Sequence, residues 1–297
     1  MKKLKKLFTV LMCCVFVGIP CSGDMYYSWP ANPGQITRSE MIPIDLELVY
    51  TGKKPAKIGS VQGFAITDKY FVIAARPCGT ALMGGETNNK IIIIDRASLE
   101  DVTNNFEHAN GVYELGHANG MTYSSQTNEL LVVGVRNENG VCRGVVHIDA
   151  DSFRCKETEF LEVDATGIAY ADEDKLYVRA HGEINLLDGD LSPIDCFNYQ
   201  SGLTSQDIAY HDGAIYLADW VRSSDFEVRT QLELATNQNV IYRINEESKE
   251  VAAFLIDKPR NELESLDFID GDAYILMNGI GKDKANFYIY RVSNDVF

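Results

Sequence analysis

The stretch "TSQDIAYHDGAIYLADW", residues 204 to 220, carries the pattern that decides the fold. It begins with polar residues, continues as a short apolar segment, turns at "HDG" and returns as a second apolar segment. Two short apolar runs separated by a few turn-forming residues are typical of a β-hairpin. The stretch therefore predicts two antiparallel strands joined by a tight turn.

Four other segments repeat this pattern. They are "SVQGFAITDKYFVIAAR" (60–76), "HANGMTYSSQTNELLVVGVR" (117–136), "DATGIAYADEDKLYVRAH" (164–181) and "ELESLDFIDGDAYILMNG" (262–279). The equivalent positions lie 57, 47, 40 and 58 residues apart, at Gly63, Gly120, Gly167, Asp207 and Ser265. Repeats of roughly 40 to 50 residues, each starting a β-meander, are typical of propeller blades.

Further strands complete each repeat. A third apolar strand follows every hairpin, and a fourth is expected after the first four hairpins, at 111–115, 154–161, 193–199 and 250–256. The fifth unit has no fourth strand of its own, and "IPIDLELVYTG" (42–52) is the segment that would complete it. Such closure removes open sheet edges. The sequence therefore predicts an all-β fold, a five-bladed β-propeller closed by an N-terminal strand, with a six-bladed propeller or an irregular sandwich as alternatives.

The N-terminus has the layout of a bacterial export signal. Four lysines precede an apolar run from Leu7 to Ile19, which small and polar residues follow. We therefore expect an export signal at 1–23, a linker at 24–43 and the propeller at 44–297. The protein would then be extracellular, periplasmic or held at the cell surface. In the last case Cys21 would be the acylated cysteine of a lipoprotein, and this lipid would be its only membrane anchor.

The charge balance restricts the partners. The chain has a formal net charge of −16, and removal of the four N-terminal lysines leaves 23 basic against 43 acidic residues, a net charge of −20. Such a balance opposes nucleic acid and anionic membrane surfaces as general partners. We expect a small anionic molecule or carbohydrate, or a partner protein.

Four cysteines remain in the mature chain. Cys78, Cys142, Cys155 and Cys196 could form two disulfides, and the sequence leaves all three connectivities open. The chain contains no pair with the C-x-x-C spacing that is typical of zinc sites.

Polar residues recur where the first strand of each blade enters the channel. Because side chains alternate along a strand, the residues four and two before each apolar core share one side. They are Ser60 and Gln62, His117 and Asn119, Asp164 and Thr166, Thr204 and Gln206, and Glu262 and Glu264. They either solvate a water-filled channel or form a ligand or ion site around His117, Asp164, Glu262 and Glu264. The sequence assigns no metal; calcium would suit this oxygen-rich ligand set best.

A second set lies where the second strands end. It consists of Arg76, Arg136, His181, Trp220 and Gly279, with Arg179 and Arg222 close by. Arginine presents a planar set of donors that matches carboxylate or phosphate. We expect these residues to bind an anionic or acidic-sugar ligand, with Trp220 or Tyr199 as a stacking face. The alternative is that the arginines pair with the acids of the first set.

If the site is catalytic, Glu262 or Glu264 would act as general acid or base with His117 as its counterpart. The leading interpretation is a propeller whose central funnel binds such a ligand, as a hydrolase or a lyase. The alternative is a non-catalytic scaffold that holds a partner protein. Whether the protein is an enzyme is left open.

Two resemblances accompany this reading. The units "GIAY...DKLYV" and "IAY...GAIYLAD" resemble secreted bacterial propellers of the broad NHL and SMP-30-like group. The "QGF" at Gln62–Phe64 and the "NELE" at Asn261–Glu264 are similar to five-bladed, plant-type glutaminyl cyclases. The second resemblance implies cyclisation of an N-terminal glutamine, with an acid near the channel mouth.

Overall fold

The structure is a computed structural model that describes residues 36–77, 88–111, 113–136, 142–172, 174–180 and 182–297. The predicted export signal, including Cys21, lies outside the described residues. So do Cys78 and His181, and only the backbone is described for Arg136 and Cys142. Among the described residues no helix has the length and apolar character needed to cross a membrane.

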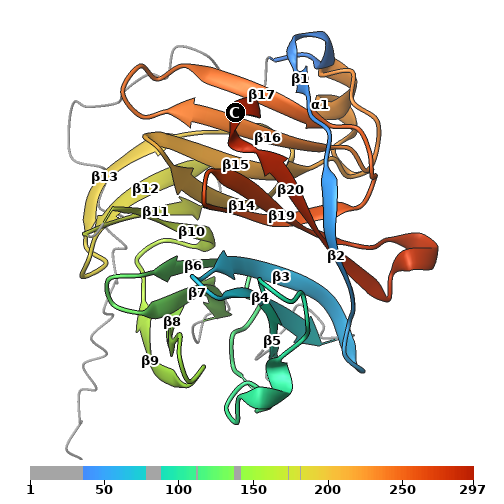
Figure 1. Cartoon of the computed structure of the whole chain (residues 1–297). Coiled ribbons are helices and arrows are strands. Elements are labelled where there is room, and N and C mark those ends of the chain that lie inside the picture. The colour runs from blue at the N-terminus through green and yellow to red at the C-terminus, as the bar shows by residue number, and fades with distance from the viewer. Residues whose placement is uncertain (1–35, 78–87, 112, 137–141, 173, 181) are drawn as a thin grey trace, which may run out of the picture.

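Five small sheets form the molecule, and we number these blades 1 to 5 in the order of their inner strands (Figure 1). Each sheet is listed from its inner strand outwards. Blade 1 has β3 (Ile58–Ile66), β4 (Tyr70–Pro77) and β5 (Lys90–Asp95); blade 2 has β6 (Gly120–Ser124), β7 (Glu129–Arg136), β8 (Cys142–Asp149) and β9 (Cys155–Phe160); blade 3 has β10 (Ala165–Asp172), β11 (Lys175–Ala180), β12 (Glu183–Asp188) and β13 (Pro193–Asn198); blade 4 has β14 (Thr204–His211), β15 (Ala214–Trp220), β16 (Asn239–Asn245), β17 (Val251–Ile256) and β1 (Ile42–Pro43); blade 5 has β18 (Glu262–Ile269), β19 (Asp272–Asn278), β20 (Asn286–Ser293) and β2 (Glu47–Lys53).

The inner strands close a ring. Each of β3, β6, β10, β14 and β18 contacts the next, and β18 contacts β3. The core consists of five apolar clusters, one at every junction between neighbouring blades. Each sheet therefore buries both of its faces, and the short apolar strands follow from this arrangement. The five-bladed propeller predicted from the sequence is confirmed.

The closing strand is also confirmed. β2 pairs antiparallel with β20, so that Thr51 lies opposite Tyr288 (Figure 1). Gly52 faces the ring of Phe287 so closely that any side chain at this position would overlap it. The segment before β2 is packed as well: β1, which falls in the predicted linker, pairs in parallel with β17.

The predicted fourth strand of blade 1 is wrong. Residues 111–115 contribute only an isolated bridge between Asn89 and Tyr113, and the described sheet of blade 1 has three strands. The physical reason is that this segment fills the junction between blades 1 and 2. Tyr113 and Leu115 join the apolar cluster there, and the Tyr113 hydroxyl donates to the carbonyl of Phe153, 2.6 Å away in blade 2.

The helical segments are short. They are η2 (Arg38–Glu40), η3 (Thr103–Asn105), α1 (Phe226–Gln231), η4 (Gly281–Asp283) and η5 (Asn294–Val296). Of the cysteines, Cys155 on β9 is free and exposed, whereas Cys196 on β13 is disulfide-bonded. Because Cys155 is free, the four cysteines do not form two disulfides with one another.

Candidate functional site

Bulges interrupt four of the five inner strands. The pairing shifts between Val61 and Phe64 in β3, Ala165 and Gly167 in β10, Ser205 and Ile208 in β14, and Leu263 and Ser265 in β18. A bulge leaves one residue out of the ladder and re-aims its side chain. The strict alternation expected from the sequence is therefore broken at Gln62, Thr166, Gln206 and Glu264.

Asp207 lies among the inner strands of blades 2, 3, 4 and 5. Its side chain is fully buried, and the Ser265 hydroxyl donates to its carboxyl group. A Cβ added to Gly120 or Gly167 would lie 2.6 or 2.7 Å from Asp207 Oδ1, so both glycines are needed to make room for it. Burial raises the pKa of Asp207 well above its usual value, which favours the neutral acid. Asp207 therefore fills the space between the inner strands of blades 2, 3, 4 and 5 at this level.

Glu264 is buried on β18, and the side-chain amides of two residues donate hydrogen bonds to it. Gln62 Nε2 donates to one of its carboxyl oxygens over 2.9 Å, and Asn278 Nδ2 donates to the other. The Val61 amide donates to Asn278 Oδ1 over 3.0 Å, which fixes the Asn278 side chain. Burial, and then the charge of Glu262, raise the pKa of Glu264 well above its usual value. Glu264 is therefore a shielded acid that favours its neutral form.

Glu262 is the first residue of β18, and we call the group that it forms with Arg222, Arg76, Lys54 and Trp220 the mouth. Its side chain is 19% exposed, and its Oε1 lies 3.8 Å from Arg222 Nη2. Gln206 Nε2 donates to the same oxygen over 3.4 Å. Burial raises the pKa of Glu262, and the positive charges of Arg222, Lys54 and Arg76 and the Gln206 hydrogen bond oppose that rise. Three basic side chains therefore act on a single, partly accessible carboxylate.

Trp220 provides a flat surface against Arg222. The Arg222 guanidinium lies 4.9 Å from the centre of the Trp220 ring, in cation–π contact, and the Arg222 side chain is 48% exposed. The indole Nε1 is buried and has no hydrogen-bond partner among the described residues. Arg222 is thus held by the indole ring while its N–H donors stay open to solvent.

Arg179, which the sequence places in the same set as Arg222, has a different environment. It is 4% exposed, and its Nη2 lies 2.5 Å from Asp219 Oδ1. Its Nη1 donates to the carbonyls of Asp207 and Ala218 over 3.0 and 2.9 Å. The structure therefore places Arg179 in the junction between blades 3 and 4.

The other predicted residues belong to other blades. The groups that bond to Glu262 and Glu264 or shift their pKa come from blades 1, 4 and 5, whereas His117, Asn119 and Asp164 belong to blades 2 and 3. All three are half-buried and lie just before β6 or β10. Their functional roles, and those of Arg136 and His181, stay predictions.

Sequence reasoning missed several residues of the site. Asp207 stands where three other blades have glycine, and this departure was a usable signal. Asn278 pairs with Glu262 across the hairpin, so it is Asn278, and not Gly279, that corresponds to Arg76 and Trp220. Lys54 has no counterpart in the repeats because it follows the closing strand. No cluster of three or more His, Cys, Asp or Glu suited to a metal ion exists in the described part of the chain, and calcium stays a prediction.

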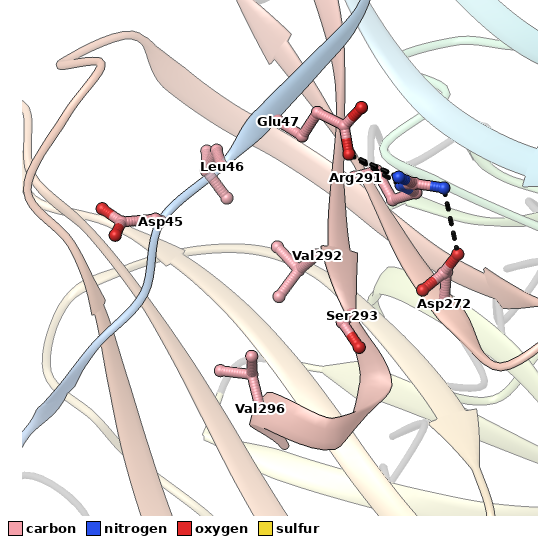
Figure 2. A pocket seen from close by; sticks show the side chains of 8 residues that line it. All are labelled: Asp45, Leu46, Glu47, Asp272, Arg291, Val292, Ser293 and Val296. Atoms are coloured by element: carbon pink, nitrogen blue, oxygen red, sulfur yellow. Dashed lines mark hydrogen bonds and ion pairs between the residues drawn. The ribbon is translucent and has the colours of Figure 1, made fainter.

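A surface hollow lies elsewhere, at the outer edge of blade 5. It has a volume of about 510 Å³ and lies where β2 meets β20. Figure 2 shows Arg291 between Glu47 and Asp272, with nitrogen-to-oxygen distances of 2.5 and 3.6 Å. None of the residues predicted for the site lines this hollow.

Among the comparisons with known proteins, the similarity to one crystal structure with a TM-score above 0.5 supports the fold. No family model matches the sequence, and no curated protein matches it. The crystal structure of Myxococcus xanthus glutaminyl cyclase is similar at 12% identity and a TM-score of 0.53, over 86% of this chain and 99% of that chain. The RRP9 WD40 repeats match at 12% identity and a TM-score of 0.42, over 80% of this chain and 67% of theirs. BamB from Moraxella catarrhalis matches at 11% identity and a TM-score of 0.37, over 84% of this chain and 100% of that chain. At these identities the similarity concerns the fold alone, and the chain is a five-bladed β-propeller.

Proposed function

We propose that the mouth formed by Glu262, Arg222, Arg76, Lys54 and Trp220 binds a small anionic ligand, with Glu262 as the proton-transfer group of a hydrolase or lyase. One observation carries the proposal. The positive charges of three basic side chains, Arg222, Lys54 and Arg76, favour the ionised form of Glu262, a partly exposed acid, in a chain whose net charge is −16.

The local charge balance explains the preference for an anion. Glu264 favours its neutral form, which leaves Glu262 as the inner carboxylate beside Arg222, Arg76 and Lys54. Asp225 adds a second partly exposed carboxylate, because it accepts hydrogen bonds from the Arg222 amide and the Thr204 hydroxyl. Three basic side chains therefore stand against two carboxylates in an acidic protein. Arg222 offers in-plane donors suited to a carboxylate or phosphate, and Trp220 offers a surface for a sugar ring. An acidic sugar would use both groups.

A thermal-shift screen tests this proposal against acidic sugars, phosphates and carboxylates. We expect at least one of these anions to raise the melting temperature of the wild type, and to raise that of Arg222→Ala much less. Arg291→Ala is a matched control, because Arg291 is similarly exposed and pairs with Glu47 at the outer edge of blade 5. If no anion stabilises the wild type, the result favours the alternative, a non-catalytic scaffold that holds a partner protein.

A second candidate is a glutaminyl cyclase-like transferase. It is favoured by the propeller that spans 99% of the Myxococcus xanthus enzyme's chain, together with an acid of raised pKa at the mouth. In this reaction the α-amine of an N-terminal glutamine attacks its own side-chain carbonyl carbon, and ammonia leaves. Glu262 would accept the proton from the amine and pass it to the leaving nitrogen.

Ammonia release from a peptide with an N-terminal glutamine tests this candidate. We expect turnover by the wild type and its loss in Glu262→Gln, whereas Glu47→Gln, at the outer edge of blade 5, should retain it. A wild-type rate equal to the uncatalysed rate would exclude the cyclase.

A further inference from the structure

We propose that anion binding at the mouth is coupled to proton uptake by Glu262, because an anion that pairs with Arg222 neutralises the cation that lies 3.8 Å from the Glu262 carboxylate and favours its ionised form. The inference rests on the proposed function and adds a means of regulation: the site would hold its ligand more tightly as the pH falls.

The geometry of Arg222 suits this exchange. Its Nη2 lies 3.8 Å from Glu262 Oε1, which is ion-pair distance but too long for a hydrogen bond. Arg222 also stacks on Trp220 at 4.9 Å, and about half of its side chain is exposed. A guanidinium carries five N–H donors in one plane. An incoming anion can therefore bind at the edge of this plane while the stacking on Trp220 persists.

The remaining groups around Glu262 act on its ionisation in opposite directions. Lys54 and Arg76 add positive charge from β2's end and from β4, and Gln206 donates a hydrogen bond from β14. Glu264, on the same strand as Glu262, is buried and favours its neutral form. Burial raises the pKa of Glu262, and Arg222 is the largest of the opposing influences. When an anion occupies Arg222, this opposing influence is lost, the pKa of Glu262 rises further, and Glu262 takes up a proton.

Calorimetric titration with sulfate tests the coupling. Sulfate stays fully ionised between about pH 5 and 8, so any proton exchanged belongs to the protein. Titrations in two buffers of different ionisation enthalpy report the number of protons taken up. We expect net uptake approaching one proton per sulfate, and an affinity that rises by up to about tenfold for each unit that the pH falls.

Two variants identify the group that takes up the proton. Glu262→Gln should bind sulfate with no proton uptake and an affinity independent of pH. Glu47→Gln removes an exposed acid that also pairs with an arginine, and it should keep the coupling. Sulfate binding by the wild type without proton uptake would overturn the inference and leave the proposed anion site standing. Absence of sulfate binding would count against the proposed function itself, and the inference would fall with it.

Discussion

Two arginine–acid pairs in this propeller have similar components and opposite environments. Arg179 and Asp219 are 4% and 0% exposed and lie 2.5 Å apart. Arg222 and Glu262 are 48% and 19% exposed and lie 3.8 Å apart. A buried charge is tolerated only when it is paired and hydrogen-bonded, whereas a charge at the surface is stabilised by water. The inner pair therefore stabilises the junction between blades 3 and 4, whereas the outer pair is open to solvent.

Removal of the inner arginine should have the largest effect. Arg179→Ala leaves the carboxylate of Asp219 buried without its cation and leaves the carbonyls of Asp207 and Ala218 without their donor. We expect the free energy of unfolding to fall by about 3 to 5 kcal/mol, measured by guanidinium denaturation. A loss of less than about 1 kcal/mol would mean that the two pairs do not differ as described.

A double substitution separates the pairing from the packing. Arg179→Met together with Asp219→Leu replaces both charges by apolar side chains of similar size. Because no charge is then left unpaired, this variant should be more stable than Arg179→Ala. If it is equally unstable, the loss in Arg179→Ala comes from altered packing between blades 3 and 4.

The hairpins and the closing strand could be predicted from the sequence because each is encoded locally, by an apolar segment, a few turn residues and a second apolar segment. Residues 111–115 also resemble a strand, but five residues do not specify which neighbour they will meet. The junction between blades 1 and 2 had room for Tyr113 and Leu115, and packing there prevailed over pairing with β5.

The site was harder to predict, because it depends on contacts between blades. Asp207 fills the space left by Gly120 and Gly167, which are 87 and 40 positions away in the sequence. The bulges that carry Gln62 and Glu264 inwards leave no clear mark in the sequence. Arg179 and Arg222 fall close together in the aligned repeats, and only the burial of each position distinguishes a structural from a ligand-facing role.

Three acids of the inner strands, whose pKa values are raised, should give the next largest effect: they should make the stability of the protein depend on pH. Burial raises the pKa of Asp267 from 3.8 to about 7, although the backbone amides of Phe268 and Ile66 oppose the rise. Between these values the folded state binds more protons than the unfolded state, so stability falls as the pH rises from about 4 to about 7. Asp207 and Glu264 act in the same direction. We expect the free energy of unfolding to be on the order of 2 kcal/mol lower at pH 8 than at pH 5, measured by urea denaturation.

The Asp267→Asn variant assigns this effect. It cannot ionise, so the difference in stability between pH 5 and pH 8 should shrink relative to the wild type. Repulsion between the negative charges of an acidic chain also lowers stability at high pH. The control is Asp270→Asn, which removes one charge from an exposed residue and reduces this repulsion as much as Asp267→Asn does. If Asp270→Asn reduces the pH dependence of stability as much as Asp267→Asn does, the dependence comes from the net charge of the chain and not from the titration of Asp267.

Removal of the outer arginine should have the smallest effect on stability. Arg222→Ala takes away a half-exposed guanidinium whose ion pair with Glu262 is loose and screened by water, and such pairs contribute about 0 to 1 kcal/mol. The cation–π contact with Trp220 adds a similar amount at an exposed site. We therefore expect a loss of at most about 1.5 kcal/mol by guanidinium denaturation, part of which disappears at high salt. A loss as large as that of Arg179→Ala would make Arg222 a structural residue and would remove the reason for placing a ligand at the mouth.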